Sequence, residues 1–560
     1  MGSETLFLGT IITVDAAAPR AEALLVRDGR IVAVGDEASV RAAVSGARAG
    51  ADADATPAAG GGSGSSADDP ALEVIELGER ALLPGFVEAH GHPTDSAIVL
   101  SHVMIDIRPV TLETADEVRA ALRAGVAAHP EGVAFNGWDG LLQKGLDDPT
   151  LEQLDEIGGA TPVVILHNSG HVVYFNSAAA ARAGIDDDSP DPVGSHWEKD
   201  AEGRLTGKGF EVGTVFAMLG PTLGPAAKEL PAMLADYLRG LNAVGLTTVG
   251  DLSWDAAKQP AVDAARAAGG LSARLRLYEM SGPGRTASVP VANGDGLVRQ
   301  VGIKTWADGS PWVGNILISF PYLDTEGTRS IGVEPGSRGS ANYSRDQLDA
   351  VVEQYFPDGW QLACHVHGDL AIDRVLDAWE ALLERHPRDD HRLRMEHVGT
   401  MTPAQFERAA RLGVTVSLLI DHVYYWGDVL VDELFGPEHG GPWANARAAL
   451  DAGLRISLHN DGTVTPAEPL RNMAVAMTRT TRSGRRMPGA DGITFDEALR
   501  AQTLDAAWQL FSDHEVGSLE VGKLADLVVL SGDPSAVEAA ELPGLRVEST
   551  WLGGVRVFGA

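Results

Sequence analysis

The hydrophobic pattern at the two ends of the chain is that of short β-strands. Apolar and polar residues alternate in TLFLGTIITV and in EALLVRDGRIVAVGD, where Asp28-Gly29 suits a two-residue hairpin turn. The C-terminal stretches GSLEVGKLADLVVLSGDP and VESTWLGGVRVFG show the same alternation with glycine turns. Because chain termini commonly lie close together, we expect residues 1–81 and 513–560 to form one small β-sandwich.

A different pattern fills the middle of the chain, residues 82–512. Runs typical of buried strands alternate there with Ala-, Leu-, Arg- and Glu-rich runs of helical period. The strand-like runs are TPVVILHN, GLTTVGDL, VGIKTWADG, WQLACHVHG, LRMEHVG, GVTVSLLI and LRISLHNDG, and examples of the helical runs are ADEVRAALRAGVAAHP, AMLADYLRGLNAVG, RDQLDAVVEQYF, AIDRVLDAWEALLERH and PAQFERAARLG. Repeated β-then-α units without a Gly-rich dinucleotide fingerprint predict an α/β fold with a TIM (β/α)8 barrel.

One segment fits neither pattern. Small and polar residues dominate at about 50–71, in AGADADATPAAGGGSGSSADDP, and nothing in this stretch could build a core. We expect a disordered insertion within the N-terminal β-region.

Composition narrows the class of protein. The chain has 560 residues, which favours one large catalytic domain with a smaller one, and its 44% hydrophobic and 22% charged residues are typical of a soluble globular protein. No apolar run approaches the roughly 20 residues of a membrane span. The opening MGSETLFLGTIITVDAAAPR has no secretory pattern, so we expect a cytoplasmic location.

Charge and cysteine content exclude further classes. The formal net charge of −34 disfavours nucleic acid and anionic membranes as partners, because they would be repelled. Cys364 is the single cysteine, so neither an internal disulfide framework nor a Cys-rich zinc cluster can form. Any metal must be bound by histidine, carboxylate or modified lysine.

Residues able to bind metal follow one predicted strand after another. His90 and His92 follow GFVEA at positions i and i+2, so both side chains project to the same side of an extended segment. On its own, such a pair is equally consistent with a metal site and with two histidines on the surface. His365, His397 and Asp461 also stand at predicted strand exits, where a barrel builds its active site. Together they form a nitrogen and oxygen ligand set suited to zinc or a similar divalent ion with an open position for water.

Lys304, in VGIKTWADG, is a further polar residue at a predicted strand end. Lysine is rarely buried unpaired, so its place in an apolar run needs a reason. A buried lysine of lowered pKa can react as a free amine, and carbon dioxide converts it to a carbamate that bridges two metals. The alternative is a lysine that extends to the surface or pairs with Asp308.

These residues lie in motifs that resemble a known family. LLPGFVEAHGHP, VGIKTWADGS, CHVHGDLAID, RMEHVG, HNDGTVTPAEPL and GSLEVGKLADLVVLSGDP resemble, in order and spacing, the hallmark segments of the amidohydrolase superfamily. HNSGHVVYFNSAAAARAGI, residues 167–185, resembles a segment of its amidohydrolase-3 (YtcJ-like) branch, which includes N-substituted formamide deformylases. The resemblance covers nearly the whole chain.

The resemblance implies a fold and a ligand set. The fold would be a distorted TIM (β/α)8 barrel with a small β-sandwich built from both chain ends. His90 and His92 would bind one metal, His365 and His397 a second, and Lys304 as an N6-carboxylated residue would bridge them. Asp461 would contact the first metal and shuttle protons. Whether one or two ions, most plausibly zinc, are bound stays open at this point.

A metal-activated water, with Asp461 as general base and then acid, would hydrolyse the C–N bond of a small amide- or formamide-type substrate. His171 and His367 are candidates for stabilising the oxyanion or orienting substrate, and each reads alternatively as a supporting or core histidine. For His459 a supporting or surface role is the better interpretation. Trp138, Trp306, Trp312, Tyr424, Tyr425 and Trp426 hint at an aromatic substrate pocket, although core packing is the commoner role of such residues.

Two alternatives stay open. The same centre suits a deaminase or a cyclic-amide hydrolase, which differ only in the leaving group. A non-catalytic scaffold that lost its metals would lack ligands, whereas every ligand position is filled here. A homo-oligomer is expected from the resemblance and from the prevalence of symmetric assemblies.

Overall fold

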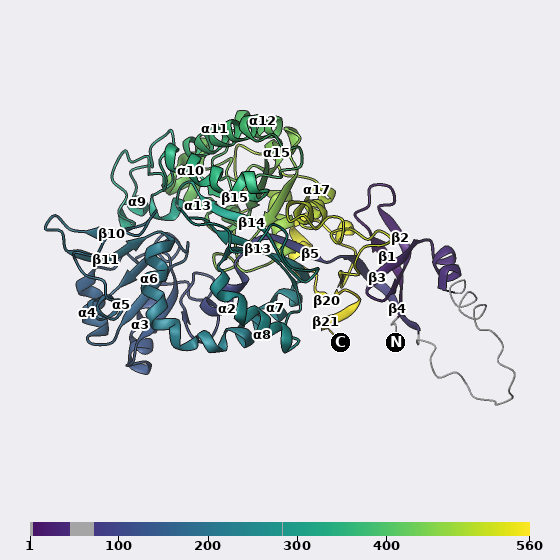
Figure 1. The fold of residues 1–560 in the computed structure, drawn as a ribbon, viewed down its shortest axis with the longest axis horizontal. Coiled ribbons are helices and arrows are strands. Elements are labelled where there is room, and N and C mark those ends of the chain that lie inside the picture. The colour runs from purple at the N-terminus through teal and green to yellow at the C-terminus, as the bar shows by residue number, and fades with distance from the viewer. Residues whose placement is uncertain (1–3, 45–71, 283, 560) are drawn as a thin grey trace.

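The computed structural model describes residues 4–44, 72–282 and 284–559, and a parallel eight-stranded sheet lies at its centre (Figure 1). Neighbouring strands pair in parallel in the order β18-β17-β16-β15-β14-β13-β12-β5, and β18 also lies against β5. The strands are β5 (Phe86–Gly91), β12 (Leu246–Trp254), β13 (Arg274–Met280), β14 (Val298–Trp306), β15 (Gln361–Val366), β16 (Arg394–His397), β17 (Thr415–Leu419) and β18 (Ile456–His459). The sheet is therefore a nearly closed barrel, which confirms the predicted fold class.

Helices cover the outside of the barrel, and α10, α11, α12 and α15 follow its upper side in Figure 1. Apart from three helices between residues 115 and 183, which are described below, the helices after β5 are α2 (Pro93–Val99), α6 (Val212–Leu223), α7 (Leu230–Ala243), α8 (Gln259–Ala267), α9 (Glu326–Ser330), α10 (Arg345–Tyr355), α11 (Asp369–Arg385), α12 (Pro403–Leu412), α13 (Asp421–Val429), α14 (Gly436–His439), α15 (Ala446–Asp451), α16 (Pro469–Thr478), α17 (Phe495–Ala501) and α18 (Leu504–Gln509).

Helix α12 shows how local sequence sets these boundaries. Thr402 and Gln405 form a reciprocal capping box at its start, and Pro403 occupies the first turn, where no backbone donor is needed. Gly413 ends the helix at a φ of 71°, a conformation that glycine adopts without strain. Between these signals Phe406 is fully buried against the barrel, as the helical period predicts.

Both chain ends build one seven-stranded sheet, which lies to the right of the barrel in Figure 1. Its order is β21-β20-β19-β4-β1-β2-β3, and its strands are β1 (Glu4–Ile12), β2 (Arg20–Arg27), β3 (Arg30–Gly35), β4 (Leu72–Pro84), β19 (Leu527–Leu530), β20 (Val547–Leu552) and β21 (Val555–Gly559). Asp28 and Gly29 join β2 to β3 with φ values of 51° and 78°, the positive values of the predicted hairpin turn. The insertion predicted at about 50–71 lies outside the described residues.

A third sheet lies between β5 and β12 in the sequence, and we call it the inserted sheet. Its order is β10-β11-β9-β8-β7-β6, with strands β6 (Ile105–Asp106), β7 (Val133–Trp138), β8 (Val163–His167), β9 (Val172–Phe175), β10 (His196–Lys199) and β11 (Leu205–Phe210) and helices α3 (Ala115–Ala128), α4 (Leu151–Gly158) and α5 (Ser177–Ala183). The run TPVVILHN, predicted as a barrel strand, is β8 of this sheet, so that assignment was wrong. The β7–α4–β8 unit has the same alternating pattern as a barrel unit, and the pattern does not say which sheet a strand joins.

No helix in the described part of the chain is both long enough and apolar enough to cross a membrane.

Candidate metal centre

The six predicted ligands come together at the carboxyl ends of the barrel strands. His92 Nε2 lies 2.9 Å from Asp461 Oδ1, and His90 Nε2 lies 3.3 Å from the same oxygen. Lys304 Nζ lies 3.2 Å from His90 Nε2. The His397 ring is 4.7 Å from the His90 ring and 4.6 Å from the His365 ring. We call these six side chains the strand-end residues.

Parallel pairing explains why residues so distant in sequence meet. Lys304 on β14 is in register with Ala363 on β15, two positions before His365, and Val366 is in register with His397 on β16. The carboxyl ends of parallel strands lie at the same edge of the barrel, so each strand exit delivers one side chain to this centre.

Three histidine-containing groups among the described residues have the spacing of metal sites. In one, His90, His92 and Asp461 each offer a ligand atom, and these atoms lie within 4.8 Å of one another. The same holds for His365, His367 and His397 in the second group, and for His90, His397 and His459 in the third. His397 Nε2 and His367 Nδ1 are buried and have no hydrogen-bond partner among the described residues. Unpartnered buried nitrogens are costly, so this donor set fits a bound cation.

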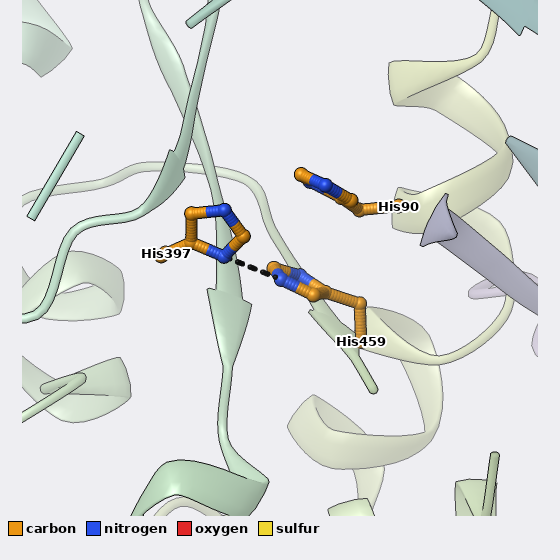
Figure 2. A group of neighbouring side chains, drawn as sticks. All are labelled: His90, His397 and His459. Atoms are coloured by element: carbon orange, nitrogen blue, oxygen red, sulfur yellow. Dashed lines mark hydrogen bonds between the residues drawn. The ribbon is translucent and has the colours of Figure 1, made fainter. Parts of the chain in front are cut away.

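Buried polar groups hold the ligands from behind. His90 Nδ1 lies 2.6 Å from the Glu396 carboxylate, and His365 Nε2 lies 2.8 Å from the carbonyl oxygen of Gly309. His397 Nδ1 lies 3.0 Å from His459 Nε2, and Figure 2 shows His459 beneath His90 and His397. Such contacts fix the ring orientation of a metal-binding histidine. The supporting role expected for His459 stays a prediction, because His459 also belongs to a group with the spacing of a metal site.

The backbone is strained at two of the predicted ligands. His397 has a φ of 70° and Asp461 a φ of 60°, values that residues with side chains rarely adopt. Strain of this kind costs about 1–3 kcal/mol per residue and gathers at functional sites. His397 is the last residue of β16 and Asp461 lies two residues beyond the end of β18, so both strained positions stand at strand exits.

Burial sets the protonation of the site. It lowers the pKa values of His365, His367 and His397 well below the ordinary range, so these imidazoles are neutral and keep a lone pair. Burial also lowers the pKa of Lys304 to about 8. Burial works the other way on Asp461, but His90 and His92 hold the pKa of that carboxyl well below its usual value.

His171 approaches the centre from the inserted sheet. Its ring is 4.7 Å from that of His365, and its Nδ1 lies 2.8 Å from a Glu211 carboxylate oxygen. Burial opposes protonation, but the Glu211 carboxylate raises the pKa of His171 above its usual value. Glu211 itself is held by Asn315, whose side-chain amide donates to it over 2.6 Å.

A cavity of about 320 Å³ opens over the strand-end residues. All six line it, together with His171. Its other lining is largely aliphatic and comes from α6, α7 and the 3-10 turn Gly224–Glu229 between them. We call this lining the apolar wall, and its side chains are Val212, Val215, Phe216, Leu219, Leu223, Ala226, Ala227, Leu230 and Met233.

Over residues 73–558 the chain matches the model of the amidohydrolase family. The chain belongs to that family. It is 30% identical to N-substituted formamide deformylase of Arthrobacter pascens, over 97% of this chain and 96% of that protein. The putative amidohydrolase YtcJ of Bacillus subtilis (strain 168) is 25% identical, over 87% of this chain and 91% of that protein. The predicted family and the prediction of a hydrolase are therefore confirmed.

A solved structure shows the same fold. An uncharacterized metal-dependent hydrolase from Pyrococcus horikoshii OT3 superposes with a TM-score of 0.71 at 20% identity, covering 96% of this chain and 99% of that one. The resemblance extends over the barrel of this amidohydrolase and over both of its additional sheets.

The hint of an aromatic pocket was mostly wrong. Of the six aromatic residues, Trp306 lines the cavity, whereas Trp138, Trp312 and Trp426 are buried in the hydrophobic core. The rings of Trp312 and Trp426 stack with their centroids 4.8 Å apart. These two residues therefore agree with the alternative interpretation, core packing. The pocket is lined mainly by aliphatic side chains instead.

Sequence reasoning missed several supporting residues, above all Glu396 and Glu211. Glu396 directly precedes His397 in the four-residue strand RMEH, in which every residue is buried, and a charge at such a position was an available signal. Glu211 has no comparable signal, because its role depends on where the inserted sheet places His171.

Proposed function

We propose that this protein hydrolyses the C–N bond of small, uncharged amide- or formamide-type substrates. One observation carries the proposal: the strand-end residues lie at the floor of a cavity whose wall is apolar. Water-activating chemistry and a neutral, hydrophobic substrate fit together there. The deformylase relative, which shares 30% identity over nearly the full length, supports an amide carbonyl as the group attacked.

The centre would hold one or two divalent ions, for which we propose zinc. His90, His92 and Asp461 would hold one ion, and His365 and His397 a second. When bound, the metal supplies a water of lowered pKa and polarises the substrate carbonyl. The neutral imidazoles and unpartnered ring nitrogens of this site fit that ligand role.

Lys304 would be N6-carboxylated. Carbon dioxide adds to a free amine, and burial favours the free amine of this lysine at neutral pH. Its Nζ lies 3.2 Å from His90 Nε2, so a carbamate there reaches the ligands of the first ion.

Asp461 would move the proton. Its carboxylate is ionised, lines the cavity and therefore can accept a proton from the attacking water. The same carboxyl then returns the proton to the leaving nitrogen as the C–N bond breaks. The products are a carboxylic acid, or formic acid from a formamide, and a free amine, with one water consumed.

His171 would donate a hydrogen bond to the carbonyl oxygen as negative charge develops on it. The Glu211 carboxylate fixes its ring and favours its protonated form. His171 lines the cavity beside His365, which places it within reach of a substrate held over the strand-end residues.

The cavity favours a substrate without charge. Apart from the strand-end residues and His171, Asp95 is the one ionisable side chain among its described lining residues. Asp95 is already paired with Lys258, whose Nζ lies 2.7 Å from its carboxylate. A carboxylate on the substrate would therefore be buried without a partner, at a cost of several kcal/mol.

The test is amine release by zinc-replete protein from matched formamides. N-hexylformamide and 6-formamidohexanoate have the same chain length and differ by one carboxylate. We expect kcat/KM to be higher for the neutral compound by on the order of 100-fold. Equal values would contradict the neutral-substrate assignment. If ammonia is released from aminated heteroaromatic rings and no amine from any amide, the centre belongs to a deaminase.

A further inference from the structure

His367 belongs to a histidine group of the centre but does not border the cavity. It lies two residues after His365, at the exit of β15, and is almost fully buried. His365 lines the cavity, whereas His367 is absent from the described lining residues. The cavity therefore gives no support to a contact between His367 and substrate, and another role must explain its place.

The backbone at His367 is fixed on three sides. Its N–H donates to Asp308 Oδ1 over 2.9 Å, and the next N–H, of Gly368, donates to Asp308 Oδ2 over 2.8 Å. Its carbonyl accepts from the N–H of Thr400 over 3.0 Å. A Cβ at Gly368 would lie 2.0 Å from the carbonyl oxygen of Leu317, so the turn is packed too tightly to shift. The backbone therefore holds the Cα of His367 in one defined position.

Neighbouring rings then fix its orientation. The His367 ring stacks on His397 at 4.9 Å and 12°, and on its other neighbours His422 and Trp443 at 5.5 and 5.7 Å. It meets His365 edge-on at 5.1 Å. In this aromatic cluster, which offers it little polar contact, Nδ1 is buried with no hydrogen-bond partner among the described residues.

Ring nitrogens of three histidines lie close together. One ligand atom from each of His365, His367 and His397 lies within 4.8 Å of the others. His365 uses Nε2 for the Gly309 carbonyl, and His397 uses Nδ1 for His459, so each keeps its other nitrogen for a ligand role. Hydrogen bonds of this kind are what orient metal-binding imidazoles.

We propose that His367 is a third protein ligand, with His365 and His397, for a divalent transition-metal ion such as zinc. The inference rests on the proposed metal centre and extends it. Three imidazoles with an open fourth position are a sufficient ligand set for zinc. This second ion therefore does not depend on Lys304. The group of His365, His367 and His397 and the group of His90, His92 and Asp461 each supply three protein ligands.

The test is metal stoichiometry, which needs no substrate. Metal-free protein is titrated with Co²⁺, with the bound metal counted by elemental analysis and the coordination followed by visible absorption. His367→Phe keeps a ring that can stack but removes the nitrogens. We expect about two ions per chain in the wild type and about one in His367→Phe, with the absorption of one site lost. We expect Lys304→Met to keep about two.

His422→Phe is the matched control, because this histidine is as buried as His367, its ring lies 5.5 Å from that of His367, and it belongs to none of the three histidine groups. It should bind as many ions as the wild type, and the far-ultraviolet circular dichroism of each metal-free variant checks folding. Equal stoichiometry in wild type and His367→Phe overturns the inference and leaves the proposed function intact. A wild type that binds no divalent metal overturns both.

Discussion

The floor of the cavity, which consists of the strand-end residues, and the apolar wall are held in place in different ways. The strand-end residues are fixed by buried charges and hydrogen bonds, such as the pair between His90 and Glu396. The apolar wall is held by apolar packing: Val215 and Leu219 pack with the inserted sheet, and Leu230 and Met233 with the barrel. From this difference we expect chemistry and substrate preference to be separable, so that a change in the wall leaves the strand-end residues in place.

The largest effect should come from the floor. Replacing Asp461 with Asn removes the group that we propose accepts and returns the proton, so we expect kcat to fall by about 10³-fold. KM for a neutral formamide should change little, since the wall is intact. Steady-state kinetics give kcat and KM, and the bound metal is counted in the same protein samples. A variant that keeps a tenth of the wild-type kcat would mean that another group moves the proton.

A second prediction concerns the charges behind the floor. Glu396 bonds to His90 and pairs with buried Arg394, and although burial raises its pKa, these two partners lower it overall. Glu396→Gln should weaken metal binding by about 10- to 100-fold. It should also cost about 3 kcal/mol of unfolding free energy, because Arg394 loses its counter-charge.

Glu497→Gln is the control for Glu396→Gln. Glu497 pairs with Arg447 at 2.9 Å, and both side chains are partly exposed to solvent. The loss of this ion pair should therefore cost less than about 1 kcal/mol of unfolding free energy. Metal titration and denaturant unfolding of both variants make the comparison. If Glu396→Gln binds metal as the wild type does, the floor is not held by its buried charges.

Lys304 and Lys258 form an internal comparison of buried lysines. Burial lowers the pKa of Lys304 to about 8, whereas the pKa of Lys258 is raised, because Asp95 and Asp251 outweigh its burial. The free amine of Lys304 increases as pH rises toward that pKa. With ¹³C-bicarbonate, metal-free protein should form a carbamate faster at about pH 8 than at about pH 6.5, on the order of tenfold.

Carbon-13 NMR detects the product of that reaction, and Lys304→Met should abolish the signal while Lys258 gives none. A signal that survives Lys304→Met would assign the carbamate to another lysine. The absence of any signal in the wild type would remove the bridging role proposed for Lys304.

The floor could be predicted from the sequence because its information is local. His90, His365 and His397 each follow a recognisable strand, and parallel pairing brings strand exits together whatever the exact register. Glu396 was missed although a charged residue in a short buried strand was a signal, because such a residue is equally consistent with a structural ion pair.

The wall could not be predicted because its information is not local. Leu219 and Met233 lie in helices whose apolar residues read as ordinary core positions, and only the inserted sheet turns some of them toward the centre. The inserted sheet itself was hidden, since β7–α4–β8 repeats the pattern of a barrel unit. Tertiary placement, rather than helix or strand formation, limits what the sequence can say about substrate preference.

The smallest predicted effect, at Phe216, tests the wall most directly. Phe216 lines the cavity and is 41% exposed, so Phe216→Ala should leave stability nearly unchanged. It removes about 1 kcal/mol of apolar contact with a bound hexyl group, or about fivefold in kcat/KM for N-hexylformamide. N-methylformamide does not extend to the wall and should be affected less.

Leu370→Ala is the control for Phe216→Ala, because Leu370 is 37% exposed and does not line the cavity. It should leave both substrates unaffected. The ratio of kcat/KM values for the hexyl and methyl compounds is the quantity to compare, since a general loss of activity cancels in it. If Phe216→Ala and Leu370→Ala give the wild-type ratio, the apolar group of the substrate does not lie against this part of the wall. If Phe216→Ala lowers both substrates equally, the wall supports the floor, and chemistry and preference are coupled after all.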